Sequence, residues 1–116
     1  MNRAEMISTI TKMEVTEAYG TITSVDWKHG MIRLIPPHMR DGILLWVGLG
    51  IQPGSFLASV IKNDLFLTIR RADEINKGIL HQYVEFFMNY APAMCFGSEE
   101  KFSAWERKGG LGGHDK

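Results

Sequence analysis

The side chains in this sequence that could do chemistry are few and scattered. The single cysteine, Cys95, lies between Met94 and Phe96, and no histidine lies three or four residues from another histidine or from the cysteine. Structural zinc sites usually take ligands at such short spacings, and a reactive thiolate needs a nearby cation to lower its pKa. We therefore expect no metal site, and we interpret Cys95 as a small buried hydrophobic side chain.

The sequence also lacks the common motifs of nucleophilic and nucleotide-dependent enzymes. It contains no G-x-S-x-G elbow, no Walker-type phosphate loop and no dinucleotide fingerprint. The carboxylate pair Glu99 and Glu100 is better explained by the positive end of a helix than by acid–base chemistry. These observations favour a protein that works by binding, with no catalytic residue and no cofactor. A hydrolase is the least favoured reading.

A more suggestive set of side chains is polar but follows no catalytic pattern. Guanidinium and amide groups can hold phosphates and bases by hydrogen bonds, and an aromatic ring can stack beside them. The six candidates for ligand binding are Arg71, Arg40, Asn76, Asp73, Asn63 and Trp46. A structural reading competes with this one, because Asn63 and Asp73 are also good helix N-caps.

Capping signals predict the helices that position these residues. Pro36–Pro37 suits a helix start and Gly50 a left-handed C-cap, which predicts a helix over His38–Leu49. Further caps predict four more helices, over Phe56–Lys62, Leu65–Ala72 and Glu74–Tyr90 and after Ser98. Arg71 would then end one helix just before Asp73 caps the next, within reach of a ligand there.

The helix expected over Glu74–Tyr90 carries two apolar rows. One row is Ile75, Ile79, Tyr83, Phe86, Phe87 and Tyr90, at steps of three and four residues. The second row is Leu80, Val84 and Met88. We therefore expect this helix to be buried over a wide arc and to form the spine of the core.

The helix expected over His38–Leu49 is apolar on more than one face. Leu44, Leu45 and Leu49 project away from the face that holds Ile43 and Trp46. Burial of each extra leucine is worth roughly 1.5–3 kcal/mol, so exposure of all three is implausible. Either other helices cover this helix on several sides, or it lies in a subunit interface. With so short a chain, we expect a homo-oligomer.

The N-terminal segment has an ambiguous pattern. Alternation from Met13 to Trp27 is typical of strands, whereas Asp26 could cap a short helix. We expect an N-terminal extension over 1–30, hairpin or irregular, a helical domain over 31–108 and a flexible glycine-rich tail over 109–116. The predicted fold is mainly α, a compact bundle of four to five helices, with a small N-terminal β-hairpin left open.

Composition narrows the class of partner and the compartment. The 116 residues contain 13 basic and 13 acidic side chains, so the net charge is zero. Because nucleic-acid binders usually carry a basic excess, generic binding to DNA or RNA is not expected. The longest nearly continuous apolar run is Ile43–Val47, far short of the roughly 20 residues that span a bilayer. With one cysteine and no leader pattern, a cytoplasmic location without membrane binding is expected.

Several short segments between residues 31 and 110 resemble a family of small phage and prophage accessory proteins. They are PPHMRDG at 36–42, GIQPGSFL at 50–57, NDL at 63–65, RAD at 71–73, NYAP at 89–92 and CFGS at 95–98. The resemblance implies a viral origin, an infected or lysogenic bacterial host, and a role in countering host defence. It implies no catalytic residue.

Two functional hypotheses follow. In the first, the protein sequesters a small nucleotide-type immune signal without cleaving it, using the six polar and aromatic candidates above. In the second, it inhibits a host defence effector by masking it through an apolar helix face. The arginine and asparagine content and the expected oligomer favour the first hypothesis slightly, since ligand pockets often form between subunits.

Overall fold

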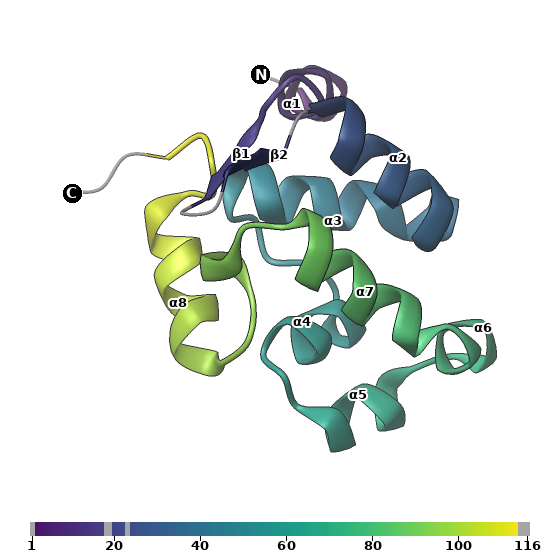
Figure 1. Cartoon of the computed structure of the whole chain (residues 1–116). Coiled ribbons are helices and arrows are strands. Elements are labelled where there is room, and N and C mark those ends of the chain that lie inside the picture. Colours follow the sequence, from purple (N-terminus) through teal and green to yellow (C-terminus); the bar gives the residue numbers. More distant parts are fainter. Residues whose placement is uncertain (1, 18–19, 23, 114–116) are drawn as a thin grey trace.

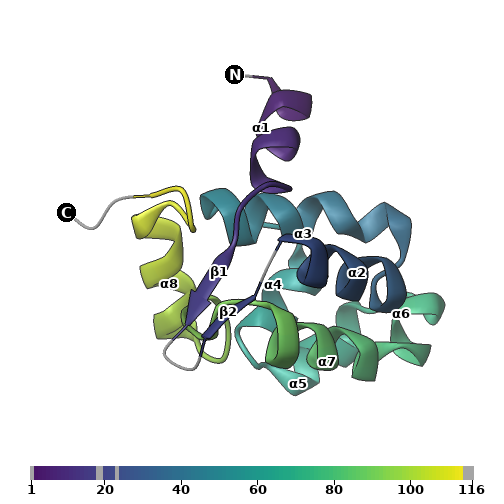
Figure 2. The ribbon, with the colours of Figure 1, turned by 45° about the horizontal axis from the view of Figure 1, so that its top comes forward.

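The computed structural model of the chain describes residues 2–17, 20–22 and 24–113, and these residues form a mainly helical fold (Figures 1 and 2). In chain order the elements are α1 (Arg3–Ile10), β1 (Val15–Glu17), β2 (Gly20–Ile22), α2 (Ser24–Leu34), α3 (Pro37–Leu49), α4 (Ser55–Ile61), α5 (Leu65–Arg71), α6 (Glu74–Gly78), α7 (Leu80–Tyr90), the 3-10 helix η1 (Ala93–Cys95) and α8 (Glu99–Lys108). None of these helices is long and apolar enough to cross a membrane. The predicted mainly α class is confirmed.

The predicted number of helices was too low, because eight α-helices occur in the described part of the chain. One reason is a break in the helix expected over 74–90. Ile79 has φ −123° and ψ 20°, so it leaves the helical region between α6 and α7. Gly78 precedes it, and glycine disfavours a helix interior by about 1 kcal/mol relative to alanine. The other reason is the N-terminal segment.

The first thirty residues contribute to the same core as the rest of the chain. α1 packs against α3, and α2 packs against α7. The indole Nε1 of Trp27, a buried side chain, donates a hydrogen bond to the carbonyl of Met13 at 2.8 Å. The boundary expected at residue 30 therefore falls inside α2. Figure 2 shows α1 meeting the body at the end that carries Ile10.

Between α1 and α2 the chain forms two short strands. β1 and β2 pair antiparallel over three residue pairs, with Val15 opposite Ile22 and Glu17 opposite Gly20. Residues 18–19, which join them, lie outside the described residues. The strand-like alternation thus corresponds to only a few residues, and from Ser24 onward the segment is helical.

α3 is covered by other parts of the same chain. Leu44, Leu45 and Trp46 are all buried, and Ile10 of α1 lies directly against the α-carbon side of Gly48. Of the two alternatives that the sequence left open for this helix, coverage by neighbouring helices is therefore correct. The apolar character of α3 gives no reason to expect an oligomer.

The C-terminal segment covers the end of α3. The amides of Leu111 and Gly112 donate hydrogen bonds to the carbonyls of Val47 and Gly48 at 3.0 and 2.9 Å. These carbonyls would otherwise lack partners at the helix end. Gly110 has φ 74°, and an added Cβ there would overlap the backbone of α3. Residues 109–113 of the predicted tail thus pack on the body, and residues 114–116 lie outside the described residues.

Candidate functional site

The six predicted binding residues do not gather into one site. Trp46 lies in the core: its ring is fully buried and stacks on Phe102 with the centroids 4.4 Å apart. Its Nε1 donates a hydrogen bond to the carbonyl of Cys95 at 3.0 Å. The expectation that Trp46 stacks on a ligand finds no support here, because both the ring and its one polar atom are already engaged inside the protein.

Asn76 and Asp73 act together at the start of α6. The Oδ1 of Asp73 accepts a hydrogen bond from the backbone amide of Asn76 at 2.7 Å, so Asp73 is the N-cap. The buried Oδ1 of Asn76 accepts a hydrogen bond from the hydroxyl of Tyr83 at 2.7 Å. Burial raises the pKa of Tyr83 well above its usual value, and the charge of Asp73 adds to this rise. The hydrogen bond between Asn76 and Tyr83 therefore joins α6 to α7.

The two arginines lie in different parts of the fold and contact backbone carbonyls. Arg40 donates from Nε to the carbonyl of Ile35 at 2.9 Å and from Nη2 to that of Ile32 at 3.1 Å, at the end of α2. Arg71 is exposed at the end of α5 and donates from Nη1 to the carbonyl of Ser55 at 3.3 Å. Each guanidinium thus has a structural partner, although each keeps donors to spare.

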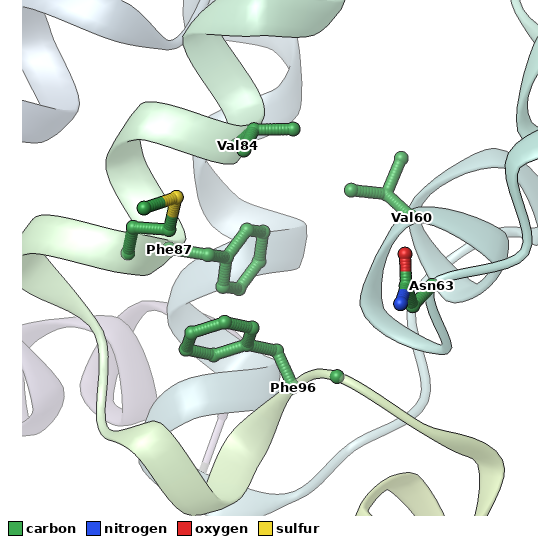
Figure 3. Close-up of a pocket in the computed structure, with 7 residues that line it drawn as sticks. Val60, Asn63, Val84, Phe87 and Phe96 are labelled. Carbon is green, nitrogen blue, oxygen red and sulfur yellow. The ribbon is translucent and has the colours of Figure 1, made fainter.

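Asn63 lines a hollow between α4 and α7. It connects α4 to α5 with φ 61°, a left-handed conformation that asparagine tolerates better than most residues. The hollow has a volume of about 210 Å³. It is lined by Val60, Asn63, Val84, Phe87, Met88, Phe96 and Gly97 (Figure 3). In Figure 3, Val60 and Asn63 lie opposite Val84 and Phe87, and the ring of Phe96 closes one end.

A second, smaller hollow continues the first. Its volume is about 90 Å³, and it shares Val60, Asn63 and Val84 with the larger one. Its other lining residues are Asp64, Leu65, Thr68 and Leu80. We call the two hollows together the apolar groove. It runs between α4 and the start of α5 on one side and α7 on the other.

The second apolar row of α7 forms one wall of this groove. Leu80, Val84 and Met88 lie four residues apart and therefore share a helix face. Leu80 is partly buried against the core, whereas Val84 and Met88 are 52% and 68% exposed, so the prediction of burial is wrong for the Val84 and Met88 part of this row. No neighbouring helix covers it among the described residues, whereas Phe87 turns inward and is buried.

The groove is suited to apolar side chains. The one formally charged residue in its lining is Asp64, whose Oδ1 already accepts a hydrogen bond from the amide of Leu67 at 3.2 Å. The described residues contain no cluster of three or more potential metal ligands. Sequence reasoning named Asn63 but missed Val60 and Phe96. The signal in the sequence that could have located the groove was the apolar second row of α7, a pattern typical either of a buried core or of a contact surface.

Comparison with known proteins adds no family to this picture. No family model, no curated protein and no solved structure matches the chain significantly. The resemblance to phage accessory proteins therefore remains a prediction from short segments.

Proposed function

We propose that this protein acts by binding another protein, a segment of which enters the apolar groove. The observation that carries the proposal is the exposed pair Val84 and Met88, which faces Val60 across an open hollow. Removing such an apolar surface from water lowers the free energy, by roughly 25 cal/mol for each Å² that apolar side chains cover. Helix-in-groove recognition uses surfaces of this kind.

The apolar lining of the groove and the separation of the predicted binding residues favour this function over the sequestration of a nucleotide-type signal. Taken singly, the two hollows of the groove offer about 210 and 90 Å³, the hollow beside Arg40 about 200 Å³ and a further hollow beside Met94 and Trp105 about 270 Å³. Pockets for small molecules are typically about 300–1,000 Å³. The candidate residues for phosphate and base also lie apart, with Trp46 in the core. A side chain of a protein partner suits the observed hollows better.

The phage resemblance supplies a class of partner within this proposal. An accessory protein that counters host defence can act by masking a defence effector, and an apolar groove is a surface that could do so. The partner chemistry that the groove selects is a segment with at least one bulky apolar side chain. Charged side chains at that point would lose hydration without gaining a partner.

A cross-linking experiment tests the proposal. A photoreactive benzoylphenylalanine in place of Met88 should form a covalent adduct with a protein of the bacterial host. The added change Val84→Glu should abolish this adduct, because it places a charge in the groove. Val25→Glu is the matched control, since Val25 is a valine of α2 with a similar exposure of 56%.

Three results would count against the proposal. No protein adduct could form at position 88, the adduct could survive Val84→Glu, or Val25→Glu could remove it equally well. The nucleotide hypothesis has its own readout: cyclic or linear nucleotides would raise the melting temperature, and Arg71→Lys would reduce this shift while Val84→Glu would not.

A further inference from the structure

The helix beside the apolar groove carries exposed apolar side chains of its own. On α5, Leu65 and Phe66 are 65% and 86% exposed, and Ile69 is also exposed. We call these three residues the α5 ridge. Phe66 presents almost its whole side chain to solvent on the same helix as Leu65, which lines the groove. A group of large exposed apolar side chains such as this is typical of a contact surface for another molecule.

The larger hollow of the groove has the size of an aromatic ring. Its volume is about 210 Å³, and an engineered apolar cavity of about 150 Å³ in another protein binds benzene. Its aromatic lining, Phe87 and Phe96 with centroids 5.6 Å apart, also suits a third ring. One chain thus presents both a projecting phenyl group and an apolar hollow that can take one.

The charges of this surface are compatible with self-association. The chain as a whole has a net charge of zero, so two copies repel each other little. The side chains of the two helices that would meet, α5 and α7, carry net charges of opposite sign. α5 contains Arg70 and Arg71 and no acidic residue, whereas α7 contains Glu85, which also lies 3.8 Å from Arg33 of α2, and no lysine or arginine. Complementary charges of this kind orient two surfaces on approach.

We infer that the natural occupant of the apolar groove in the isolated protein is Phe66 of a second copy of the chain. Because ridge and groove lie side by side on each copy, a two-fold axis lets both copies insert Phe66 at once, which closes the assembly as a dimer. The inference rests on the proposed function, since it names the first protein partner of the same groove. A host protein would then have to displace the second copy.

Sedimentation equilibrium of the full chain tests this inference. The expected mass is twice the 13.1 kDa of one chain. Phe66→Ser and Val84→Glu should each weaken the dimer at least tenfold, because one removes the ring and the other charges its receptor. Val25→Glu should leave the dimer unchanged. Circular dichroism should show the same melting temperature for dilute samples of all three variants, since all three positions are exposed.

Mixing the two weakened variants gives a sharper test. A pair of Phe66→Ser and Val84→Glu chains keeps one intact contact, in which the Phe66 ring of the Val84→Glu chain enters the unmodified groove. The mixture should therefore form heterodimers more readily than either variant forms homodimers. No gain on mixing, or a Phe66→Ser variant that dimerises like the wild type, would overturn the inference.

The proposed function can survive that failure. A wild-type chain that stays at 13.1 kDa at hundreds of micromolar, yet still forms a host-protein adduct at position 88, would refute the dimer alone. Self-adducts at twice the chain mass without any host adduct would support the dimer and leave no support for a host partner.

Discussion

The regions around α3 and α5 differ in whether their apolar side chains are buried. Both helices are apolar on more than one face, but Leu44 and Leu45 of α3 are buried, whereas Leu65 and Phe66 of α5 are exposed. The difference lies in their neighbours. α1, α8 and the C-terminal segment reach α3, whereas α5 packs mainly on α4. An apolar helix of this chain therefore stays exposed only where no other described segment packs over it.

The sharpest way to test this contrast is to truncate one aromatic side chain in each region. Trp46→Ala should lower the free energy of unfolding by about 3–5 kcal/mol, because it leaves a cavity beside Phe102 and removes the hydrogen bond to Cys95. Phe66→Ala, measured by urea unfolding in the same dilute buffer, should change it by less than about 0.5 kcal/mol. Equal losses in both variants would contradict the division into a covered and an uncovered region.

A second pair of variants tests the coverage of α3 without removing any atom. Gly48→Ala should destabilise by about 1–3 kcal/mol, because the new Cβ would overlap the side chain of Ile10. Gly42→Ala in the same helix is the control. Its Cβ would meet only Leu57 Cδ1, at 3.4 Å, so the better helix propensity of alanine should leave stability unchanged or raise it by up to about 1 kcal/mol.

If Gly48→Ala proves as stable as Gly42→Ala, α1 does not pack on α3 in solution. Combining Gly48→Ala with Ile10→Ala should then show no coupling. The structure instead predicts that the double variant loses less than the sum of the two single losses, since the overlap disappears with the Ile10 side chain.

The buried row of α7 gives a smaller effect that depends on pH. Tyr83→Phe should cost about 1 kcal/mol at pH 7, because the acceptor of Asn76 loses its buried donor. Burial, with a contribution from Asp73, raises the pKa of Tyr83 in the folded state. The unfolded chain therefore ionises first, near pH 10, and the wild type loses stability above that pH.

The Tyr83→Phe variant lacks this proton linkage, so the stability gap between the two proteins should narrow by roughly 1 kcal/mol per pH unit above about pH 10. Urea unfolding at pH 7 and at pH 11 measures it. A gap that stays constant between these two values would show that the hydroxyl is not held in its neutral form.

The smallest effect is expected at the groove edge. Leu65→Ser should alter the free energy of unfolding by no more than about 0.5 kcal/mol, because Leu65 is exposed in the single chain. It should weaken association measurably if the ridge and groove meet in a dimer. A loss of several kcal/mol in dilute monomer would mean that α5 is covered by the chain itself.

Local signals in the sequence predicted most helix ends from α3 onward and the caps Gly50, Asp73 and Ser98. The cap of α5 is Asp64 and not Asn63, its neighbour. Gly50 is left-handed with φ 67°, and Asp64, Asp73 and Ser98 each accept a hydrogen bond from an amide three residues on. Such interactions involve residues within one turn of each other, so residue type alone decides them. α1, which precedes the alternating pattern, was missed. α2 was expected only as a short helix that Asp26 could cap, because the alternation from Met13 to Trp27 favours strands.

The candidate site was harder to predict, because its residues come together only through packing. Asn63 was named from its residue type, but Val60 and Phe96 have no chemical signature, and they meet Val84 across α4, α7 and the segment after η1. Trp46 and Asn76 were predicted to bind a ligand because an aromatic ring can stack on a base and an amide can form hydrogen bonds with it. Whether such a group faces a ligand or the interior depends on neighbours far along the chain.

The sequence by itself determined the mainly helical class and the capped ends of α3, α5, α6 and α8. It did so because propensity and capping act over a few residues. Only the tertiary structure decided which apolar faces are covered: α3 is enclosed, whereas Val84 and Met88 of α7 and the α5 ridge remain exposed. In this chain of 116 residues, burial depends on the path of the whole chain, because a helix is covered only where long-range contacts bring another segment against it.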